Sequence, residues 1–211
     1  TLCFIFDFGG GTLDITVATL GGDKPKIIGS KGVLVGGDDF DKRIITQMFP
    51  HFGKGGKLLR RNAAGQIKEF PIPSHIWESL LDWQTAEALK HSDALDLIKE
   101  ASKKNSSTNP EGFSALHTLL TKNFYYALLR AVENAKIELS TNEEATIFLK
   151  VGDTSIHEVL TRKQFEGLIA TEVNIIHKAI NEVLIENDIK PEEIEQVIST
   201  GGSSRIPVLI Q

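Results

Sequence analysis

The sequence predicts an α/β protein, and three observations support this class. Two β-rich runs near the start, within residues 2–20, flank a turn of three consecutive glycines. The stretches 114–140 and 161–186 carry apolar residues at helical spacing. A last β-rich run, residues 196–200, leads into two further glycines. Strands and helices that meet at glycine turns are typical of an α/β domain whose loops face a ligand.

The first predicted loop combines glycines with carboxylates. The glycines at 9–11 leave no Cβ to block the backbone, so a phosphate could approach their N–H groups closely. Asp7 and Asp14, on either side, could hold a hydrated cation beside that phosphate, and Thr12 adds a hydroxyl donor. An acidic hairpin turn without a ligand is the alternative interpretation.

Two better-known phosphate motifs are excluded. The dinucleotide pattern G-x-G-x-x-G fails because Asp14 stands at its third glycine position and a strand follows. The glycine- and lysine-rich stretch 53–57 is followed by Leu58, so it lacks the Ser or Thr of a Walker-type loop.

Composition narrows the function classes. The 211 residues are 41% hydrophobic and 24% charged, which is ordinary for a globular protein. The net charge of −5 gives no signature of nucleic-acid binding, and no apolar run is long enough to span a membrane. The six histidines lack metal-ligand spacing. Cys3 is the only cysteine, so we expect a cytoplasmic protein without an internal disulfide.

The first third of the chain predicts a small sheet followed by a helix. Residues 2–7, 13–20 and 26–30 are expected to form neighbouring antiparallel strands, with a turn at 21–25. A helix over 36–52 begins with an acidic first turn, which suits the positive end of the helix dipole. Its apolar positions recur at helical spacing: Phe40, Ile44, Ile45 and Met48.

The middle third predicts helices joined by polar loops. Residues 53–65 are expected to form a mobile loop, and a helix begins at about 73–74 and continues to about 89. Residues 103–112 are rich in helix breakers and predict a loop, after which a long helix covers about 114–140. Trp77 and Trp83 are expected to be core residues of a small helical appendage, with a partner-binding surface as the alternative.

The last third predicts a hairpin, a capped helix and a ligand loop. The hairpin covers 148–160, and Thr161 is expected to cap a helix that runs to about 186. After the strand at 196–200, the glycines at 201–202 precede an expected helix, so backbone N–H groups would face an anion there. One face of the long middle helix carries Glu133, Lys136, Ile137 and Ser140. These side chains could bind a nucleoside, and the alternative interpretation is an ordinary solvent-exposed helix face with a Glu–Lys pair.

Four of these segments resemble motifs of one family. Residues 7–14 resemble the second phosphate motif of the superfamily that contains actin, hexokinase and heat-shock protein 70. Residues 36–41, 133–140 and 201–207 resemble motifs of the heat-shock protein 70 family in particular, the last two being its adenosine-binding helix and adenosine loop.

The resemblance implies an actin-like ATPase (ribonuclease H-like) fold and, for this chain, the second lobe of that domain. An inner α/β subdomain would come from 1–36 and 161–211. A smaller α+β outer subdomain would come from 37–160 and would contain an insertion, at about 53–120, that is atypical of the family.

The resemblance also implies the ligands, ATP or ADP with Mg, and the residues that bind them. Asp7 and Asp14 would hold the cation through water and, with Thr12, take part in catalysis. The phosphates would face Gly9, Gly10, Gly11 and Thr12. Gly36, Gly37 and Asp38 would complete this side of the site, although Asp38 replaces the family's usual glutamate with a shorter side chain.

The nucleoside would lie between two further groups of residues. The outer subdomain would supply Glu133, Lys136, Ile137 and Ser140. The inner subdomain would supply Gly201, Gly202, Ser203, Arg205 and Ile206.

The function implied is that of a divergent chaperone whose full protein couples ATP hydrolysis to binding of unfolded polypeptide clients, with co-chaperones as further partners. The family's first phosphate motif, its catalytic lysine and a peptide-binding domain have no counterpart here. The chain also begins on a core strand without an initiator methionine, so we expect a fragment that is inactive alone. An actin-like filament or scaffold ATPase, a small-molecule kinase and a pseudo-ATPase remain as alternatives.

Overall fold

The computed structural model describes residues 1–21 and 24–209. Part of the turn predicted at 21–25 therefore lies outside the described residues, as does the end of the chain. The chain forms two compact units. The first, called unit 1, contains Thr1–Asp41, Glu138–Glu143 and Thr161–Gln211, and the second, called unit 2, contains Lys42–Ile137 and Glu144–Leu160. Each unit is described by itself.

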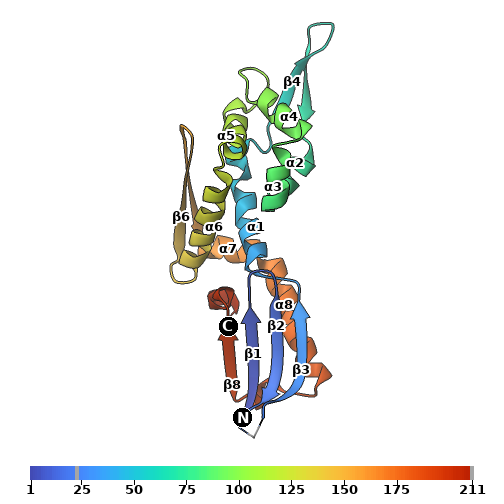
Figure 1. Ribbon diagram of the computed structural model, residues 1–211, viewed down its shortest axis with the longest axis vertical. Helices are drawn as coiled ribbons and strands as arrows, with labels where there is room; N and C mark the ends of the chain where they lie inside the picture. Colours follow the sequence, from blue (N-terminus) through green and yellow to red (C-terminus); the bar gives the residue numbers. More distant parts are fainter. Residues whose placement is uncertain (22–23, 210–211) are drawn as a thin grey trace. The chain divides into compact units, whose positions relative to one another are not determined.

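Unit 1 is built on a four-stranded sheet (Figure 1). The predicted antiparallel meander is confirmed as β1 (Leu2–Phe8), β2 (Leu13–Thr19) and β3 (Lys26–Val33). The strand β8 (Gln196–Thr200), from the far end of the sequence, pairs with β1 in parallel, which gives the order β3-β2-β1-β8. The parallel pairing places the loops that follow β1 and β8 at the same end of the sheet.

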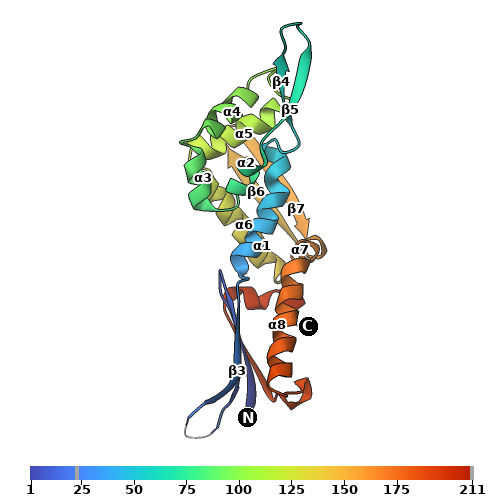
Figure 2. The same cartoon turned by 90° about the vertical axis from the view of Figure 1, so that its right-hand side faces the viewer.

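One face of this sheet forms the core of unit 1. Successive strand residues alternate between faces, so Phe4, Phe6 and Phe8 point to one side together with Leu13 and Ile15 of β2, and all five are buried. The helix α8 (Ala170–Glu186) packs on β2 and β3 and runs along the sheet (Figure 2).

The helix α7 (Arg162–Leu168) precedes α8 and begins as predicted. Thr161 forms a capping box: its side chain accepts a hydrogen bond from the Gln164 N–H, and the Gln164 side chain accepts one from the Thr161 N–H at 2.9 Å. The single helix predicted to 186 is divided at Ile169, which is fully buried. A short 3₁₀ turn, η2 (Pro191–Glu193), follows α8.

The helix predicted over 36–52 is confirmed as α1 (Gly37–Met48) followed by the 3₁₀ turn η1 (Phe49–Phe52). The four apolar positions predicted on its core face are buried: Phe40, Ile44, Ile45 and Met48. Phe40 also contacts Phe8 edge to face, with ring centroids 5.5 Å apart.

Unit 2 contains a hairpin where the sequence predicted a mobile loop, so that prediction was wrong. The strands are β4 (Lys57–Arg61) and β5 (Ile67–Pro71). Asn62 shapes the connection because its side-chain oxygen accepts from the N–H groups of Ala64 and Gln66 at 3.0 and 2.9 Å, and Gly65 adopts a φ of 76°. The hairpin projects from the helices of its own unit (Figures 1 and 2).

The helices of unit 2 are shorter than predicted. The stretch 74–89 divides into α2 (Ser74–Ser79) and α3 (Trp83–Leu89) because the Asp82 side chain caps α3 by accepting from the N–H groups of Gln84 and Thr85. The helix α4 (Asp93–Ala101) follows. Trp77 is buried, as predicted, whereas Trp83 is 50% exposed, so the core prediction was wrong for the second tryptophan.

The long helix predicted at 114–140 also divides. It forms α5 (Pro110–Thr121) and α6 (Tyr125–Leu139), separated where Asn123 takes a φ of 58°. The predicted hairpin is confirmed as β6 (Glu144–Val151) and β7 (Thr154–Thr161), which turn at Gly152. In the part of the chain that is described, no helix has both the length and the apolar character needed to cross a membrane.

Candidate functional site

The glycine turn between β1 and β2 does not need its glycines for its own geometry. Gly9, Gly10 and Gly11 have no positive φ. A Cβ on Gly11 would meet no atom within 4 Å, and one on Gly9 would lie 3.4 Å from the Thr12 carbonyl, an ordinary contact. A Cβ on Gly10 would lie 3.2 Å from Asp38 Oδ1, a tight contact with a side chain. The absence of side chains here therefore keeps open the space outside the turn.

The hydrogen bonds of the turn leave donors directed outward. The Gly9 N–H donates to the Thr12 carbonyl at 2.9 Å and closes the turn. Within residues 1–21 and 24–209, no hydrogen bond uses the N–H groups of Gly10 and Gly11, and both residues are exposed. Two adjacent exposed N–H groups can bind an anion.

Two other predicted glycines serve a different purpose, which is close packing against this turn. A Cβ on Gly36 would lie 2.0 Å from the Gly10 carbonyl oxygen. A Cβ on Gly201 would lie 2.0 Å from the Phe8 carbonyl oxygen, and Gly201 has a φ of 86°. Both glycines let a second segment approach the backbone of the turn.

Backbone hydrogen bonds hold the segment 36–38 against the turn. The Gly37 N–H donates to the Gly9 carbonyl at 3.1 Å, and the Asp38 N–H donates to the Gly10 carbonyl at 2.8 Å. The carbonyl groups of the turn thus face segment 36–38. Unit 1 therefore brings together three of the four segments that were predicted to form the site.

The two predicted cation-binding carboxylates face each other. Asp7 and Asp14 are directly paired in the β1–β2 register, so their side chains lie on the same face of the sheet, and both are exposed. The Thr200 hydroxyl donates to Asp7 Oδ1 at 3.4 Å. Like charges directly opposite each other destabilise a sheet, and a bound cation would remove that cost.

The donor set at Asp7 and Asp14 fits Mg²⁺, which prefers carboxylate oxygen and retains several waters. Among the described residues, no group of three or more His, Cys, Asp or Glu side chains is arranged to hold a metal. A cation at this pair would therefore complete its coordination with water and with oxygens of a ligand. Thr12 is exposed beside the pair.

The junction after β8 differs from its prediction. In place of a helix, residues Gly202–Arg205 form the 3₁₀ turn η3 and Pro207–Leu209 form η4. The Ser204 hydroxyl donates to the Gly201 carbonyl at 2.7 Å and stabilises the turn. Gly202 has no atom within 4 Å of its Cβ position, so it resembles Gly11 in leaving open space.

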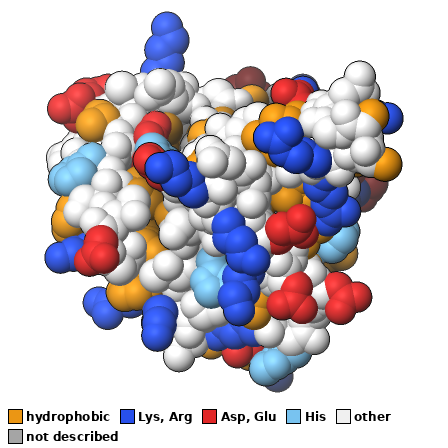
Figure 3. Space-filling model, turned by 90° about the horizontal axis from the view of Figure 1, so that it is seen from above, with side chains coloured by type: hydrophobic (Ala, Val, Ile, Leu, Met, Phe, Trp, Pro, Cys, Tyr) orange, Lys and Arg blue, Asp and Glu red, His pale blue; other side chains and the backbone are white. Residues whose placement is uncertain are grey.

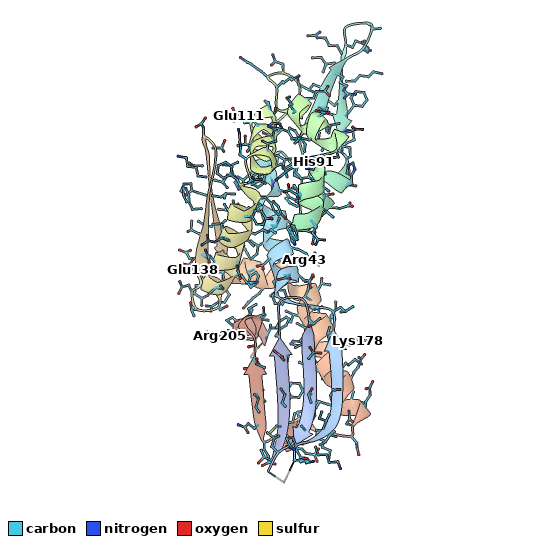
Figure 4. All side chains as sticks on the ribbon, in the orientation of Figure 1. Arg43, His91, Glu111, Glu138, Lys178 and Arg205 are labelled. Carbon is cyan, nitrogen blue, oxygen red and sulfur yellow. The ribbon has the colours of Figure 1, made fainter. Side chains whose placement is uncertain are left out.

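The predicted ligand side chains of this junction have different surroundings. Arg205 is exposed beyond the end of β8 (Figure 4). Ser203 is 9% exposed and Ile206 only 1% exposed. Arg205 and the backbone at Gly201 and Gly202 are therefore the accessible parts of this segment, and Ile206 packs in the interior.

The helix α6 presents the remaining predicted residues on one face. Its opposite face is buried and consists of Tyr125, Leu128, Val132, Ala135 and Leu139. Ile137 is 60% exposed, which leaves an apolar side chain outside that core. Ser140 follows the last helical residue. Glu133, Lys136 and Ile137 belong to unit 2 and Ser140 to unit 1, so this face is described apart from the glycine turn.

Two residues with clear roles in unit 1 were missed by the sequence analysis. Thr200 bonds to Asp7, and Asp39 Oδ2 accepts from the Gly36 N–H at 3.0 Å. The sequence carried a signal for each residue. Thr200 stands at the end of a predicted strand, directly before two glycines. Asp39 lies in the acidic first turn of a helix.

Comparisons with known proteins point to one family. A family model described as Hsp70 protein matches residues 115–211. The chain is 27% identical to the Chaperone protein DnaK of Thermosipho melanesiensis, over 97% of this chain and 26% of that protein. It is 26% identical to the chloroplastic Heat shock 70 kDa protein 6 of Arabidopsis thaliana, over 97% of this chain and 21% of that protein.

A further relative is the Stromal 70 kDa heat shock-related protein, chloroplastic, of Spinacia oleracea, which is 26% identical over 98% of this chain and 26% of that protein. The chain thus spans about a quarter of the length of the curated relatives it matches. Its mixed α/β fold is consistent with a fragment of the actin-like ATPase domain of that family. The family model and the named relatives together show that the chain is similar to the heat-shock protein 70 family.

Proposed function

We propose that this chain binds the phosphates of ATP or ADP, with Mg, as part of the nucleotide-binding domain of a chaperone. The observation that carries the proposal is the turn at 9–11. None of its glycines has a positive φ, Gly9 and Gly11 have room for a Cβ, and the turn lies beside the facing carboxylates of Asp7 and Asp14. A ligand that needs both close backbone approach and a cation explains this combination.

Each residue of the site has a proposed role. The N–H groups of Gly10 and Gly11 and the Thr12 hydroxyl donate to the terminal phosphates, where negative charge develops during hydrolysis. Asp7 and Asp14 hold the cation through water, and the cation supplies charge neutralisation when it is bound. Gly36 and Gly201 support the turn from behind.

The nucleoside is proposed to contact the remaining predicted residues. The guanidinium of Arg205 is exposed and can stack on the base, and the open backbone at Gly202 can approach the α-phosphate. Glu133, Lys136 and Ser140 would bond to the ribose and the base, and the exposed Ile137 would pack on the base.

The activity of the full protein is a further part of the proposal. This chain spans about a quarter of the length of the relatives that carry the names chaperone and heat-shock protein. We propose that, as in that family, ATP hydrolysis in the full protein is coupled to binding of unfolded polypeptide, with co-chaperones as partners. Units 1 and 2 are proposed to be the inner and outer subdomains of the second lobe. The free, buried Cys3 suits a reducing compartment, and the cytoplasm is our proposal.

Calorimetric titration of the full protein with ADP, with and without Mg, tests the proposal. Gly11→Val should weaken ADP binding by about tenfold or more because the new side chain occupies the approach to the turn. Gly167→Val is the matched control, since Gly167 also has no atom within 4 Å of its Cβ position but lies in α7. Asp7→Asn should reduce the Mg dependence of binding. Unchanged ADP affinity in Gly11→Val would contradict the proposal.

A further inference from the structure

We propose that the β4–β5 hairpin and the loop before α5 form a groove that binds an extended acidic polypeptide segment. The groove lies entirely in unit 2, and it has a volume of about 850 Å³. It is lined by residues of the hairpin, of the loop 102–107 and of the first turn of α5: Leu59, Arg60, Arg61, Ile67, Ser102, Lys104, Asn105, Ser107, Pro110, Glu111 and Ser114.

The charge of the groove is positive although the chain as a whole is acidic. Arg60, Arg61 and Lys104 line it, against a single carboxylate, Glu111. Lys68 does not line the groove, but it is paired with Arg60 across the hairpin, so two cations lie side by side at its border, an arrangement that an anionic partner would stabilise. Seen from the end of unit 2 that carries the hairpin, exposed Lys and Arg side chains lie among Asp and Glu side chains (Figure 3).

Both arginines are positioned by contacts that leave further donors available. Arg60 Nη2 bonds to Glu100 Oε2 at 3.0 Å, and Arg61 Nη1 donates to the Gly65 carbonyl at 3.0 Å. Each guanidinium has five N–H donors in a planar fork. A carboxylate from a partner can therefore bind to either side chain without breaking the existing contacts.

The groove also borders an unpaired stretch of strand edge. On the side of β4 away from β5, the Thr108 N–H donates to the Lys57 carbonyl and the Leu59 N–H donates to the Ser106 carbonyl, both at 2.9 Å. The pairing then ends, because the Ser106 N–H donates to Lys103 instead.

The strand nevertheless continues beyond this point. The two-residue period of a strand directs the N–H and C=O groups of Arg61 to the same edge as those of Leu59. Among the described residues, no hydrogen bond uses the Leu59 carbonyl or either backbone group of Arg61. An extended peptide can pair with such an edge and extend the sheet.

These observations favour a polypeptide over other anions. Grooves that bind single-stranded nucleic acid typically combine positive charge with aromatic side chains that stack on bases, and none of the residues that line this groove is aromatic. Ile67 is 57% exposed and Leu59 is half-buried, so apolar side chains of a partner would also be covered. An extended peptide that carries both acidic and apolar residues matches the edge, the charge and the apolar contacts together.

Fluorescence anisotropy with a labelled peptide of alternating Glu/Asp and Val residues tests the proposal on the purified chain. We expect saturable binding that weakens with salt. Arg61→Glu and Lys104→Glu should each weaken it by roughly tenfold. Lys178→Glu, the matched charge reversal in α8 of unit 1, should change it less than about twofold. Circular dichroism checks that each variant is folded, and Lys104→Glu leaves the hydrogen bond from Arg61 to Gly65 intact.

Two further probes separate strand pairing from simple charge attraction. The same peptide with alternate backbone nitrogens methylated should lose most of its affinity, because it can no longer donate to the strand edge. A peptide in which Gln and Asn replace Glu and Asp should bind at least about tenfold more weakly. Equal binding of the methylated peptide, or displacement of the acidic peptide by a 12-nucleotide single-stranded RNA at equal charge concentration, would overturn the proposal in favour of a general polyanion surface.

Discussion

At the scale of single residues, the glycines around the candidate site have two distinct functions. Gly36 and Gly201 are glycines because another backbone segment occupies the place of their Cβ. Gly11 and Gly202 have no such contact and no positive φ. The four residues look alike in the sequence, but substitution should affect stability in one pair and ligand binding in the other.

Gly201→Ala and Gly202→Ala provide a direct comparison. Gly201→Ala should destabilise unit 1 by roughly 2–4 kcal/mol, because alanine is strained at a φ of 86° and its Cβ would collide with the Phe8 carbonyl. Gly202→Ala should change stability by less than about 1 kcal/mol. Thermal and urea unfolding of both variants measure the difference. Equal stability of the two proteins would show that the contact with Phe8 is not structural.

Tyr125 links stability to pH. Its hydroxyl is buried and donates to the Leu80 carbonyl at 2.8 Å. Burial, assisted by the carboxylate of Asp82, raises the pKa of Tyr125 above that of a free tyrosine. As the pH rises, the folded state therefore keeps the Tyr125 proton after the unfolded state has lost it. The contribution of Tyr125 to the free energy of unfolding is complete below a pH of about 10 and declines above it.

Tyr125→Phe tests this linkage. At neutral pH it should cost about 1–2 kcal/mol, because the Leu80 carbonyl loses its donor. Above pH of about 10 the native protein should lose stability more steeply than the variant, by up to ~1.4 kcal/mol per pH unit. Urea unfolding at pH 7, 9.5 and 10.5 gives both values. Parallel pH profiles would contradict the assignment to Tyr125.

At the scale of elements, local capping decides where helices begin and divide. Thr161 and Asp82 each accept backbone N–H groups at the start of a helix. The cap at Thr161 was predicted from the sequence, but the one at Asp82 was missed because apolar residues on both sides of it suggested one continuous amphipathic helix from 74 to 89. The β4–β5 hairpin was missed for a related reason. Its turn depends on side-chain bonds of Asn62, and β5 is exposed along its whole length, so no buried alternation marks it.

Thr161→Ala should destabilise α7 by about 1 kcal/mol, since it removes the side-chain acceptor for the Gln164 N–H. Thr161→Ser retains a hydroxyl and should lower the free energy of unfolding by no more than a few tenths of a kcal/mol. Chemical unfolding monitored by circular dichroism distinguishes the two. Equal losses from Ala and Ser would indicate that the threonine methyl, rather than the cap, is what matters.

At the scale of the whole molecule, the chain consists of two compact units whose sequences interleave. Unit 1 uses both ends of the chain, and β1 and β8 pair although they are almost 200 residues apart in sequence. The candidate phosphate loops, at 9–11, 36–38 and 201–202, all belong to this unit. The projecting hairpin and its basic groove belong to unit 2, so the two proposed binding sites can be tested separately.

We expect the 211-residue chain by itself to hydrolyse ATP negligibly. The reason is that it spans about a quarter of its relatives' length, and that the described residues of unit 1 supply the proposed site with phosphate donors and cation-binding carboxylates only. Release of phosphate from radiolabelled ATP is the measurement, with Asp7→Asn as the control. Turnover by the pure chain that Asp7→Asn abolishes would show that unit 1 and unit 2 suffice for catalysis.

The sequence by itself determined the α/β class, the antiparallel meander, the helix with its buried face at Phe40–Met48 and the family resemblance. Periodicity, turn residues and short motifs are local, so they can be recognised without coordinates. Only the tertiary structure decided that β8 completes the sheet beside β1, that Asp7 and Asp14 face each other, and that Gly36 and Gly201 pack behind the turn while Gly11 remains open. These are contacts between distant segments, and their distances depend on how the whole chain packs.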